Sequence, residues 1–320
     1  MAAFTSKLAL PKVADALVVG GGPAGLATAL TLARNVHTTI VFDSRSYRNA
    51  RADHFHMLPT WDRKSPIDFR DAAKKNTLDN YGTVFYQDVT IQRAAKNGEL
   101  FELTDQYGKV WQGRTLCLAT GIIDIPVDIL GFTECWGYSI ASSGVLAMDD
   151  LTPIPIALHV ARNAAQMTKT VTLYTHGHAA LASELEAAAG PLAPFMVDSR
   201  RIAQFVLGPD RTGLTMHFED GTAREEAFLA HKPKSKLKSD FLAQQLGLEL
   251  TPQGDVKANG PFGETSLSGC FAAGDCASFL KTAPNAVNSD ANSAAGLASH
   301  IQSRMYGQRS LSEAMQQMGK

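Results

Sequence analysis

The sequence predicts an α/β protein made of two doubly wound, three-layer domains, one inserted into the other. Three observations predict this fold. An apolar run at 15–19 leads into the turn GGGPAG and then the helix-forming stretch LATALTLAR. Two further apolar runs, at 116–121 and 270–276, have the pattern of buried strands that end in small and polar residues. A second series of helix and strand patterns lies between them.

Length and composition are those of an ordinary globular enzyme. The chain has 320 residues, of which 45% are hydrophobic and 19% charged, which is enough for one large or two ordinary domains. The formal net charge of −1 predicts neither a nucleic-acid partner nor an anionic membrane. The basic run HKPKSKLK at 231–238 is typical of a solvated loop rather than a binding patch.

The cysteines and the chain ends predict a reduced, cytoplasmic protein. No signal peptide and no apolar run long enough to span a membrane is evident. The spacing of the cysteines matches neither a zinc site nor a disulfide framework, so no metal is expected. The four are Cys117, Cys135, Cys270 and Cys276.

The first part of the chain continues the strand–turn–helix pattern. TTIVFD at 38–43 is expected to be a second strand, which closes a βαβ unit. A polar loop leads to a helix at 68–82, and residues 83–118 alternate like a β-meander that ends in a buried strand. This part, residues 1–125, together with 250–320, forms the first predicted domain.

The middle of the chain, residues 126–249, forms the inserted domain. Patterns of helix at 155–167, strand at 171–177 and helix at 179–190 are followed by a hairpin at 202–222 and a strand at 227–231. The crossovers between domains are expected near Pro126 and within 240–255. After the second crossover, residues 285–307 predict one long helix with small residues near its start.

The glycine turn predicts a dinucleotide site. Gly20, Gly22 and Gly25 match G-x-G-x-x-G between a strand and a helix, and the next strand ends in an acidic residue. The glycines permit a tight turn, close approach of a pyrophosphate and close helix packing, while the helix N-terminus attracts phosphate. A plain glycine turn is the alternative. The expected binding residues here are Gly20, Gly22, Pro23, Ala24, Gly25, Asp43 and Ser44.

Two further segments favour FAD over NAD. One strand ends at Ala119-Thr120-Gly121, and a second ends at Gly274-Asp275, where a carboxylate can accept hydrogen bonds from ribityl hydroxyls. The following segment, 284–296, is expected to direct a helix N-terminus at the flavin pyrimidine ring, where its dipole favours negative charge. This adds Asn285, Ala286 and Val287 to the expected FAD contacts.

In this order and spacing, GGGPAGLATAL, ATG and FAAGD resemble the low-molecular-weight thioredoxin reductases over nearly the whole chain. FDSRSYRNA, HFHMLPTWDRKSPIDFR, GFTECWG, SGVLAMDDL and VTLYTHG are similar to the fungal, gliotoxin-type dithiol oxidases. The resemblance implies FAD, a homodimer, and a Cys-x-x-Cys that oxidises dithiols and passes electrons to oxygen in secondary-metabolite pathways. It also implies FAD contacts from Arg48, Asn49, His54 and Val89.

The redox-active cysteine pair of that family is missing. The family carries it between a Trp-Gly and the start of the second domain, but here only YSIAS lies between Trp136-Gly137 and SGVL. A deletion of the loop is the preferred interpretation. The alternative aligns Cys135 with one of the two family cysteines, which would keep a single flavin-facing thiol. Under either interpretation no dithiol/disulfide couple can form, because that requires two thiols within bonding reach.

The second glycine motif is also missing, so NADPH is not expected. Asp149, Asp150 and Pro153 stand where the turn should be, and two carboxylates would repel a pyrophosphate. After the next strand, the chain has YTHGH instead of basic residues. His176 and His178 are expected to be surface histidines rather than phosphate ligands.

The expected function is FAD-dependent oxidation of a small secondary metabolite, directly by the flavin, with molecular oxygen as the acceptor. His54 and His56 are candidate proton acceptors, with a purely structural role as the alternative. Asp290 is a third catalytic candidate, and the expected pocket residues are Trp136, Tyr138 and Asn292, with core packing as the alternative for the two aromatic residues. Two other functions stay open: a non-redox cyclase or isomerase that uses acid/base residues beside the flavin, and a catalytically silent binding protein.

Overall fold

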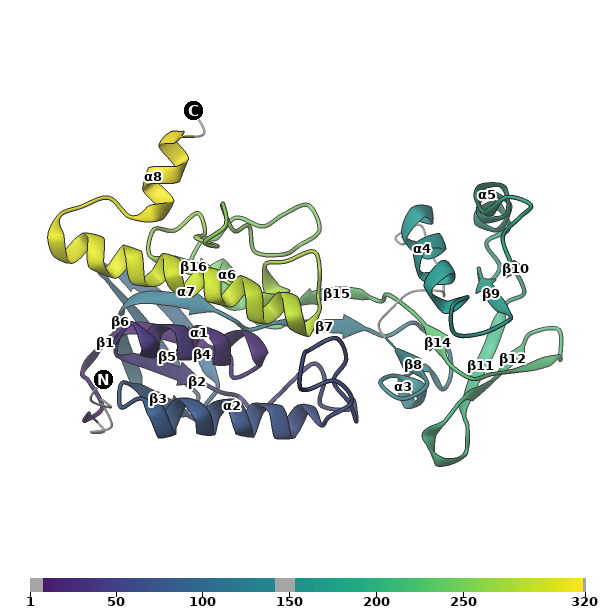
Figure 1. The fold of residues 1–320 in the computed structure, drawn as a ribbon, viewed down its shortest axis with the longest axis horizontal. Helices are drawn as coiled ribbons and strands as arrows, with labels where there is room; N and C mark the ends of the chain where they lie inside the picture. The colour runs from purple at the N-terminus through teal and green to yellow at the C-terminus, as the bar shows by residue number, and fades with distance from the viewer. Residues whose placement is uncertain (1–7, 142–152, 319–320) are drawn as a thin grey trace. The chain divides into compact units, whose positions relative to one another are not determined.

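The computed structural model describes residues 8–141 and 153–318. The chain divides into two compact units. The first unit joins Met1–Ile123 to Lys236–Lys320, and the second is Asp124–Ser235. Figure 1 shows the elements of each unit. The two-unit α/β fold class is therefore as predicted.

A parallel sheet forms the centre of the first unit (Figure 1). Its strands, in spatial order, are β3 (Val84–Gln87), β2 (Thr39–Phe42), β1 (Val13–Val19), β6 (Val110–Leu118) and β16 (Cys270–Ala272). Val19 pairs with both Phe42 and Leu118, so these three strands end at the same edge. The loops that carry most predicted FAD contacts begin at this edge.

Helices and a meander complete the first unit. Small buried residues, such as Ala29 and Ala294, let α1 and α7 pack closely against one face of the sheet. The antiparallel strands β4 and β5 join the first half of β6. The elements are α1 (Pro23–Arg34), α2 (Pro66–Asn80), β4 (Ile91–Asn97), β5 (Leu100–Asp105), α6 (Asp240–Gln245), η2 (Gly274–Cys276), α7 (Ala283–Tyr306) and α8 (Leu311–Met318).

The second unit combines parallel strand pairs with an antiparallel sheet. β9 (Val171–Tyr174) pairs with β10 (Phe195–Asp198) and packs with α4 (Ile154–Ala164) and α5 (Ala179–Ala189). A second parallel pair is β8 (Ile140–Ala141) with β14 (Leu229–Ala230). The antiparallel sheet is β11 (Ile202–Leu207), β12 (Leu214–Phe218) and β13 (Ala223–Glu226), flanked by α3 (Phe132–Cys135) and η1 (Pro209–Arg211).

The structure corrects the second predicted domain boundary. The crossover strands are β7 (Ile122–Ile125) and β15 (Lys234–Leu237), which pair with each other. The chain therefore re-enters the first unit at Lys236, not near residue 250. The reason is packing: Leu242, Ala243 and Leu246 of the α6 region join the core of the first unit.

The structure also corrects the predicted meander. β3 was expected to be its first strand but pairs in parallel with β2, so the antiparallel meander begins at β4. Strand β10 and helix α8 were not predicted. Among the residues that the structure describes, no helix is long and apolar enough to cross a membrane.

Candidate functional site

The glycine turn lies at the carboxyl edge of the parallel sheet, between the ends of β2 and β6. The Gly20 N–H donates to the Phe42 carbonyl at 2.9 Å, and the Ala119 N–H donates to the Val19 carbonyl at 2.9 Å. A Cβ at Gly20, whose φ is +130°, would lie 2.1 Å from the Ala119 oxygen. The turn is thus fixed by the strands on both sides.

The three glycines of the motif have different surroundings. A Cβ at Gly25 would lie 1.9 Å from the Gly20 carbonyl oxygen, so this position is packed against the turn itself. A Cβ at Gly22 would meet no atom within 4 Å, and Gly22 has an extended backbone that other residues adopt. Gly22 caps α1 without a side-chain hydrogen bond, which leaves the first N–H groups of the helix for a ligand. This open cradle fits a pyrophosphate.

Asp43 follows β2 at the same edge and is 7% exposed. Its Oδ1 accepts from the Arg45 N–H at 2.8 Å, and its Oδ2 accepts from the Tyr47 hydroxyl at 2.6 Å. A carboxylate has about four acceptor positions, so ribose hydroxyls can still bind. Ser44 beside it is exposed, and Val89 packs against the core of the first unit.

Tyr47 and Arg70 support this carboxylate, and sequence reasoning missed both. The Arg70 guanidinium stacks 3.9 Å from the centre of the Tyr47 ring and donates to Asn49 Oδ1 at 3.1 Å. Burial, with the Asp43 charge, raises the pKa of Tyr47, so its hydroxyl stays a donor to Asp43. Tyr47 lies in FDSRSYRNA, a segment already identified as similar to the family, so the sequence could have pointed to it. The same holds for Arg70, the last residue of the similar segment HFHMLPTWDRKSPIDFR.

Two predicted FAD contacts that are far apart in sequence meet in the structure. Arg48 Nη1 lies 3.1 Å from Asp275 Oδ2 and also donates to the Lys281 carbonyl at 3.2 Å. Asp275 follows Gly274, which has a φ of +71° and whose virtual Cβ would lie 2.7 Å from the Cβ of Ala24. The loop after β2, the turn after β16 and the start of α1 therefore form one site.

The remaining predicted FAD contacts border the same edge. Thr120 and Gly121 follow β6 after the buried Ala119. Thr282 caps α7 by accepting from the Asn285 N–H at 3.4 Å. The Asn285 side chain donates to Ser278 Oγ at 2.7 Å and to the Leu280 carbonyl at 2.8 Å, so it holds the preceding loop. Ala286 is buried and Val287 half-buried.

Asp290 differs from the expectation that it faces a substrate. Its side chain is fully buried, and Oδ1 accepts from the Thr28 hydroxyl of α1 at 3.3 Å. Oδ2 has no hydrogen-bond partner among the described residues and lies near the Gly274 turn. Burial raises the pKa of this carboxyl well above its ordinary value. Asp290 is therefore enclosed in the α1–α7 contact and is not presented to a substrate.

The two candidate histidines lie on the surface. His54 and His56 are exposed in the loop between β2 and α2, and His56 Nδ1 lies 3.8 Å from Asp62 Oδ1. Phe55 between them is buried and contacts Phe69 of α2, with 5.0 Å between ring centroids. Phe55 thus anchors the loop and leaves both imidazoles accessible. Their catalytic role stays a prediction.

The expected pocket residues of the second unit are packed within that unit. Trp136 stacks on Phe132 at 5.6 Å, and Arg211 lies 4.7 Å above the Tyr138 ring. Cys135 is fully buried in the same core. This location does not support the alternative of a flavin-facing Cys135. Asn292 is half-buried on α7, in the first unit.

The segment where a second glycine turn was sought is only partly described. Asp149 and Asp150 lie outside the described residues, and Pro153 directly precedes α4. After β9, His176 Nδ1 accepts from the Ile202 N–H at 2.9 Å, and burial lowers the pKa of His176. A histidine that accepts at this nitrogen is neutral and belongs to the fold. His178 is exposed.

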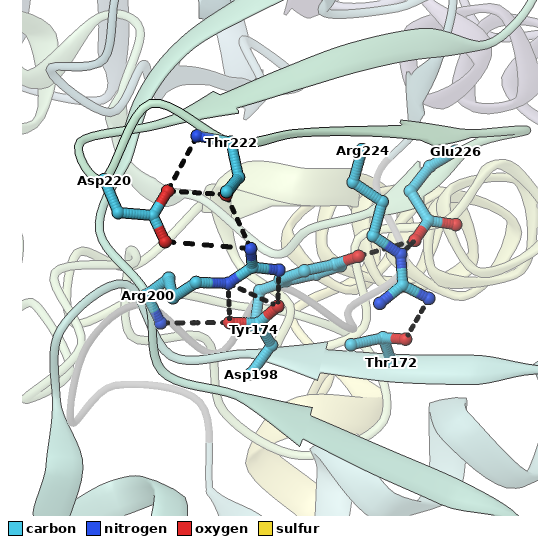
Figure 2. Close-up of polar contacts among 8 residues, drawn as sticks. All are labelled: Thr172, Tyr174, Asp198, Arg200, Asp220, Thr222, Arg224 and Glu226. Carbon is cyan, nitrogen blue, oxygen red and sulfur yellow. Dashed lines mark hydrogen bonds and ion pairs between the residues drawn. The ribbon is translucent and has the colours of Figure 1, made fainter.

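Figure 2 shows what surrounds the ends of β9 and β10 in the second unit. Arg200 binds Asp198 through two nitrogens, at 3.0 and 2.5 Å, and donates to Thr222 Oγ1 at 2.7 Å. Its guanidinium also stacks 3.9 Å from the Phe218 ring centre. This arginine joins the end of β10 to the antiparallel sheet.

A second arginine makes the same kind of link (Figure 2). Arg224 Nε lies 2.9 Å from Glu226 Oε1, and Arg224 Nη2 donates to Thr172 Oγ1 at 2.9 Å. The Tyr174 hydroxyl donates to the same Glu226 oxygen at 2.5 Å. Both arginines of this cluster are therefore paired with carboxylates of their own unit.

Comparisons with known proteins agree with the first unit's geometry. A family described as an FAD binding domain matches residues 15–55. Thioredoxin reductase tcpT of Claviceps purpurea is 43% identical over 290 residues, which cover 86% of this chain and 90% of that protein. Thioredoxin reductase sirT of Leptosphaeria maculans is 37% identical and covers 90% and 94%, respectively.

Solved structures share the fold across nearly the whole chain. HlmI has a TM-score of 0.80 at 20% identity and covers 94% of this chain and 96% of its own. The putative thioredoxin reductase TrxB from Bacillus anthracis has a TM-score of 0.78 at 23% identity, with coverage of 91% and 99%. At these identities the structures establish the fold alone.

Proposed function

Because this chain belongs to the thioredoxin-reductase-like family of FAD-dependent oxidoreductases, we propose that it oxidises a small metabolite directly at the flavin. Oxygen is the electron acceptor in this proposal, and no dithiol relay takes part. The observation that carries it is the state of the cysteines. The sequence has four, and no two form a Cys-x-x-Cys.

The surroundings of these cysteines support the same conclusion. All four thiols are buried. Burial raises the pKa of Cys270 to about 12 and of Cys276 to about 11, so neither is a thiolate near neutral pH. Since the thiolate is the form that exchanges with disulfides, these thiols are poorly suited to a relay.

The chain's own residues would hold the cofactor and manage the proton. When bound, FAD supplies a two-electron acceptor that oxygen can reoxidise. Gly22 and the start of α1 would receive the pyrophosphate, Asp43 the adenosine ribose, and Asp275 the ribityl chain. His54 or His56 would accept the substrate proton, because both imidazoles are exposed and histidine is a common general base. One substrate losing two electrons and two protons to O2 gives one H2O2.

A substrate-driven reaction also agrees with the second unit. Arg200 and Arg224 are engaged by Asp198 and Glu226, and His176 accepts from the backbone. A 2′-phosphate would have to compete with these pairs. We therefore propose that NADPH is not the reductant. We propose a secondary metabolite as the substrate and a homodimer as the assembly, as the resemblance of the sequence to the fungal dithiol oxidases implies.

The decisive experiment is a visible spectrum of the purified holoprotein under anaerobic conditions. We expect NADPH to leave the flavin oxidised and dithionite, as the control, to bleach it. Small secondary metabolites are then screened for bleaching and, in air, for one peroxide per product. Rapid bleaching by NADPH would overturn the proposal and indicate a reductase or a monooxygenase. Product without bleaching or oxygen uptake would instead favour the non-redox cyclase or isomerase.

A further inference from the structure

Lys238 differs from the two lysines that precede it in the basic run. The run was expected to be a solvated loop, but Lys234 and Lys236 lie exposed on the strand β15, because the run forms part of the crossover, and Lys238 after them is half-buried. The reason lies in the end of β15, where Leu237 enters the core of the first unit and is 6% exposed. The next residue is then held at the surface of that core instead of extending into solvent.

Lys238 connects the ends of two strands of the parallel sheet. Its backbone N–H donates to the Gly121 carbonyl, just beyond β6, at 3.2 Å. Its ammonium donates to the Ser46 carbonyl, in the loop that follows β2. In the sheet, β1 lies between β2 and β6. Lys238 therefore joins the loops that follow the two strands on either side of β1, and the open glycine turn follows β1 itself.

The neighbouring arginines are paired with carboxylates, whereas Lys238 interacts with the Asp43 carboxylate only as a longer-range charge. Arg45 is paired with Asp88 at 2.7 Å, and Arg48 with Asp275 at 3.1 Å. Lys238, in contrast, has no carboxylate within ion-pair distance in the described part of the chain, and its one hydrogen bond uses one of three donors. A pyrophosphate brings negative charge to the same edge.

We propose that the Lys238 ammonium binds a phosphate oxygen of the adenosine diphosphate half of FAD. The lysine comes from the second crossover, so the same segment that returns the chain to the first unit also closes its dinucleotide site. This inference rests on FAD binding and not on the identity of the substrate. Burial supports it, since a partly desolvated ammonium interacts more strongly with an anion than one in bulk water.

The test is titration of the deflavinated protein with FAD and with ADP. K238Q keeps an amide donor for Ser46 but removes the charge, K238R restores the charge, and K236Q is the matched control on the exposed lysine of the run. We expect K238Q to weaken FAD and ADP by about tenfold to a hundredfold, as one charge-assisted hydrogen bond requires. K238R should stay within about threefold of the wild type, and K236Q should not change.

Two further readouts separate binding from folding. The melting temperature of deflavinated K238Q should match the wild type, and its ADP affinity should depend less on salt, since one phosphate contact is lost. Unchanged ADP and FAD affinities in K238Q would overturn the inference, and so would a fall in melting temperature without a change in affinity. Either result leaves substrate oxidation standing. Conversely, a protein that binds FAD through Lys238 but bleaches with no metabolite contradicts only the proposed function.

Discussion

The two units treat the loop at the end of a parallel strand in opposite ways. After β1, the first unit leaves open space at Gly22, and no side chain of the N-cap residue covers the first N–H groups of α1. After β9, the second unit uses His176 to accept a backbone N–H, while Arg200 neutralises Asp198. One loop is arranged for a ligand and the other is satisfied by its own chain.

This difference teaches that the described part of the second unit is held together by contacts within its own chain. The core of the second unit lies between α4, α5 and β9, where residues such as Leu158, Leu173 and Leu185 are buried. Polar links such as Arg200–Asp198 add to it. Since none of these contacts needs a dinucleotide, the fold places no demand on the phosphate loop.

The largest effect is expected from a side chain placed in the open space at Gly22. G22V places a side chain where no atom lies within 4 Å, on a backbone that valine tolerates. We expect FAD to bind at least about a hundredfold more weakly, because the pyrophosphate can no longer approach the backbone. The melting temperature of the deflavinated protein should not change. Titration calorimetry measures the FAD affinity, and circular dichroism measures the melting temperature.

G25V is the matched control, at the packed glycine of the same motif. Its Cβ would lie 1.9 Å from the Gly20 carbonyl oxygen, so the turn itself must move. We expect a loss of about 3 kcal/mol or more in the free energy of unfolding, even without cofactor. If G22V and G25V behave alike, the distinction between an open and a packed glycine is wrong.

A second test compares carboxyls in the two units. Burial raises the pKa of the Asp290 carboxyl. The pKa of Asp198 is lowered, mainly because this carboxylate accepts hydrogen bonds from the Arg200 side chain. A raised pKa means that the folded state keeps a proton which the unfolded state has lost above its ordinary pKa of 3.8. The Asp290 contribution to stability therefore falls as pH rises toward the raised pKa.

The variant D290N removes this titration. We expect wild-type stability to fall relative to D290N by up to about 1.4 kcal/mol per pH unit as the pH rises above the ordinary pKa of 3.8. Urea unfolding of the deflavinated protein at several pH values measures it. D128N, at an exposed aspartate, is the control and should follow the wild type. Parallel curves for wild type and D290N would mean that Asp290 is ionised or solvated.

Breaking the Arg200–Asp198 pair of the second unit should change the free energy of unfolding by a smaller amount, and with the opposite pH dependence. R200M leaves Asp198 without its arginine, so we expect a loss of about 1 kcal/mol near neutral pH, since the arginine is partly exposed. The Asp198 contribution is present above its ordinary pKa and is lost as pH falls through the lowered value, so the R200M defect should shrink in acid.

Hydrogen exchange can locate this defect. Protection in β9 to β13 should fall in R200M, while FAD affinity should remain that of the wild type. R201M, at the exposed neighbour, is the control. A loss of FAD affinity in R200M alone would show that the second unit takes part in cofactor binding, against the comparison drawn above.

Patterns within short stretches of sequence predicted the strands, turn and helix of the site better than the side chains that hold them in place. The GGGPAG turn, the strand before it and the helix after it are contiguous in sequence, so their pattern predicted β1 and α1 directly. VFYQ at 84–87 has a strand pattern, but the pattern does not say which strand it pairs with. Tertiary packing pairs it with β2, so its assignment to the meander was wrong.

The side chains that sequence missed or misplaced depend on contacts made across long separations. Lys238 meets Ser46 across 192 positions, and Asp290 meets Thr28 across 262. In the sequence, Lys238 was one cation in a basic run, and Asp290 one polar residue near a helix start. Only packing decides that the first is held at the sheet edge and the second is enclosed between two helices.

The smallest expected effect concerns Cys135, the one thiol that could have been a remnant of the family's pair. It is fully buried with Phe132 and Phe205 in the core of the second unit. C135A removes only a sulfur, so we expect at most about 1 kcal/mol of destabilisation and no change in the rate at which substrate bleaches the flavin. Stopped-flow absorbance with the substrate found in the metabolite screen measures that rate, and C117A, also buried, controls for the loss of a thiol. A tenfold or greater slowing in C135A alone would show that a thiol does exchange electrons with the flavin, and the chemistry of the family would then survive here with one cysteine.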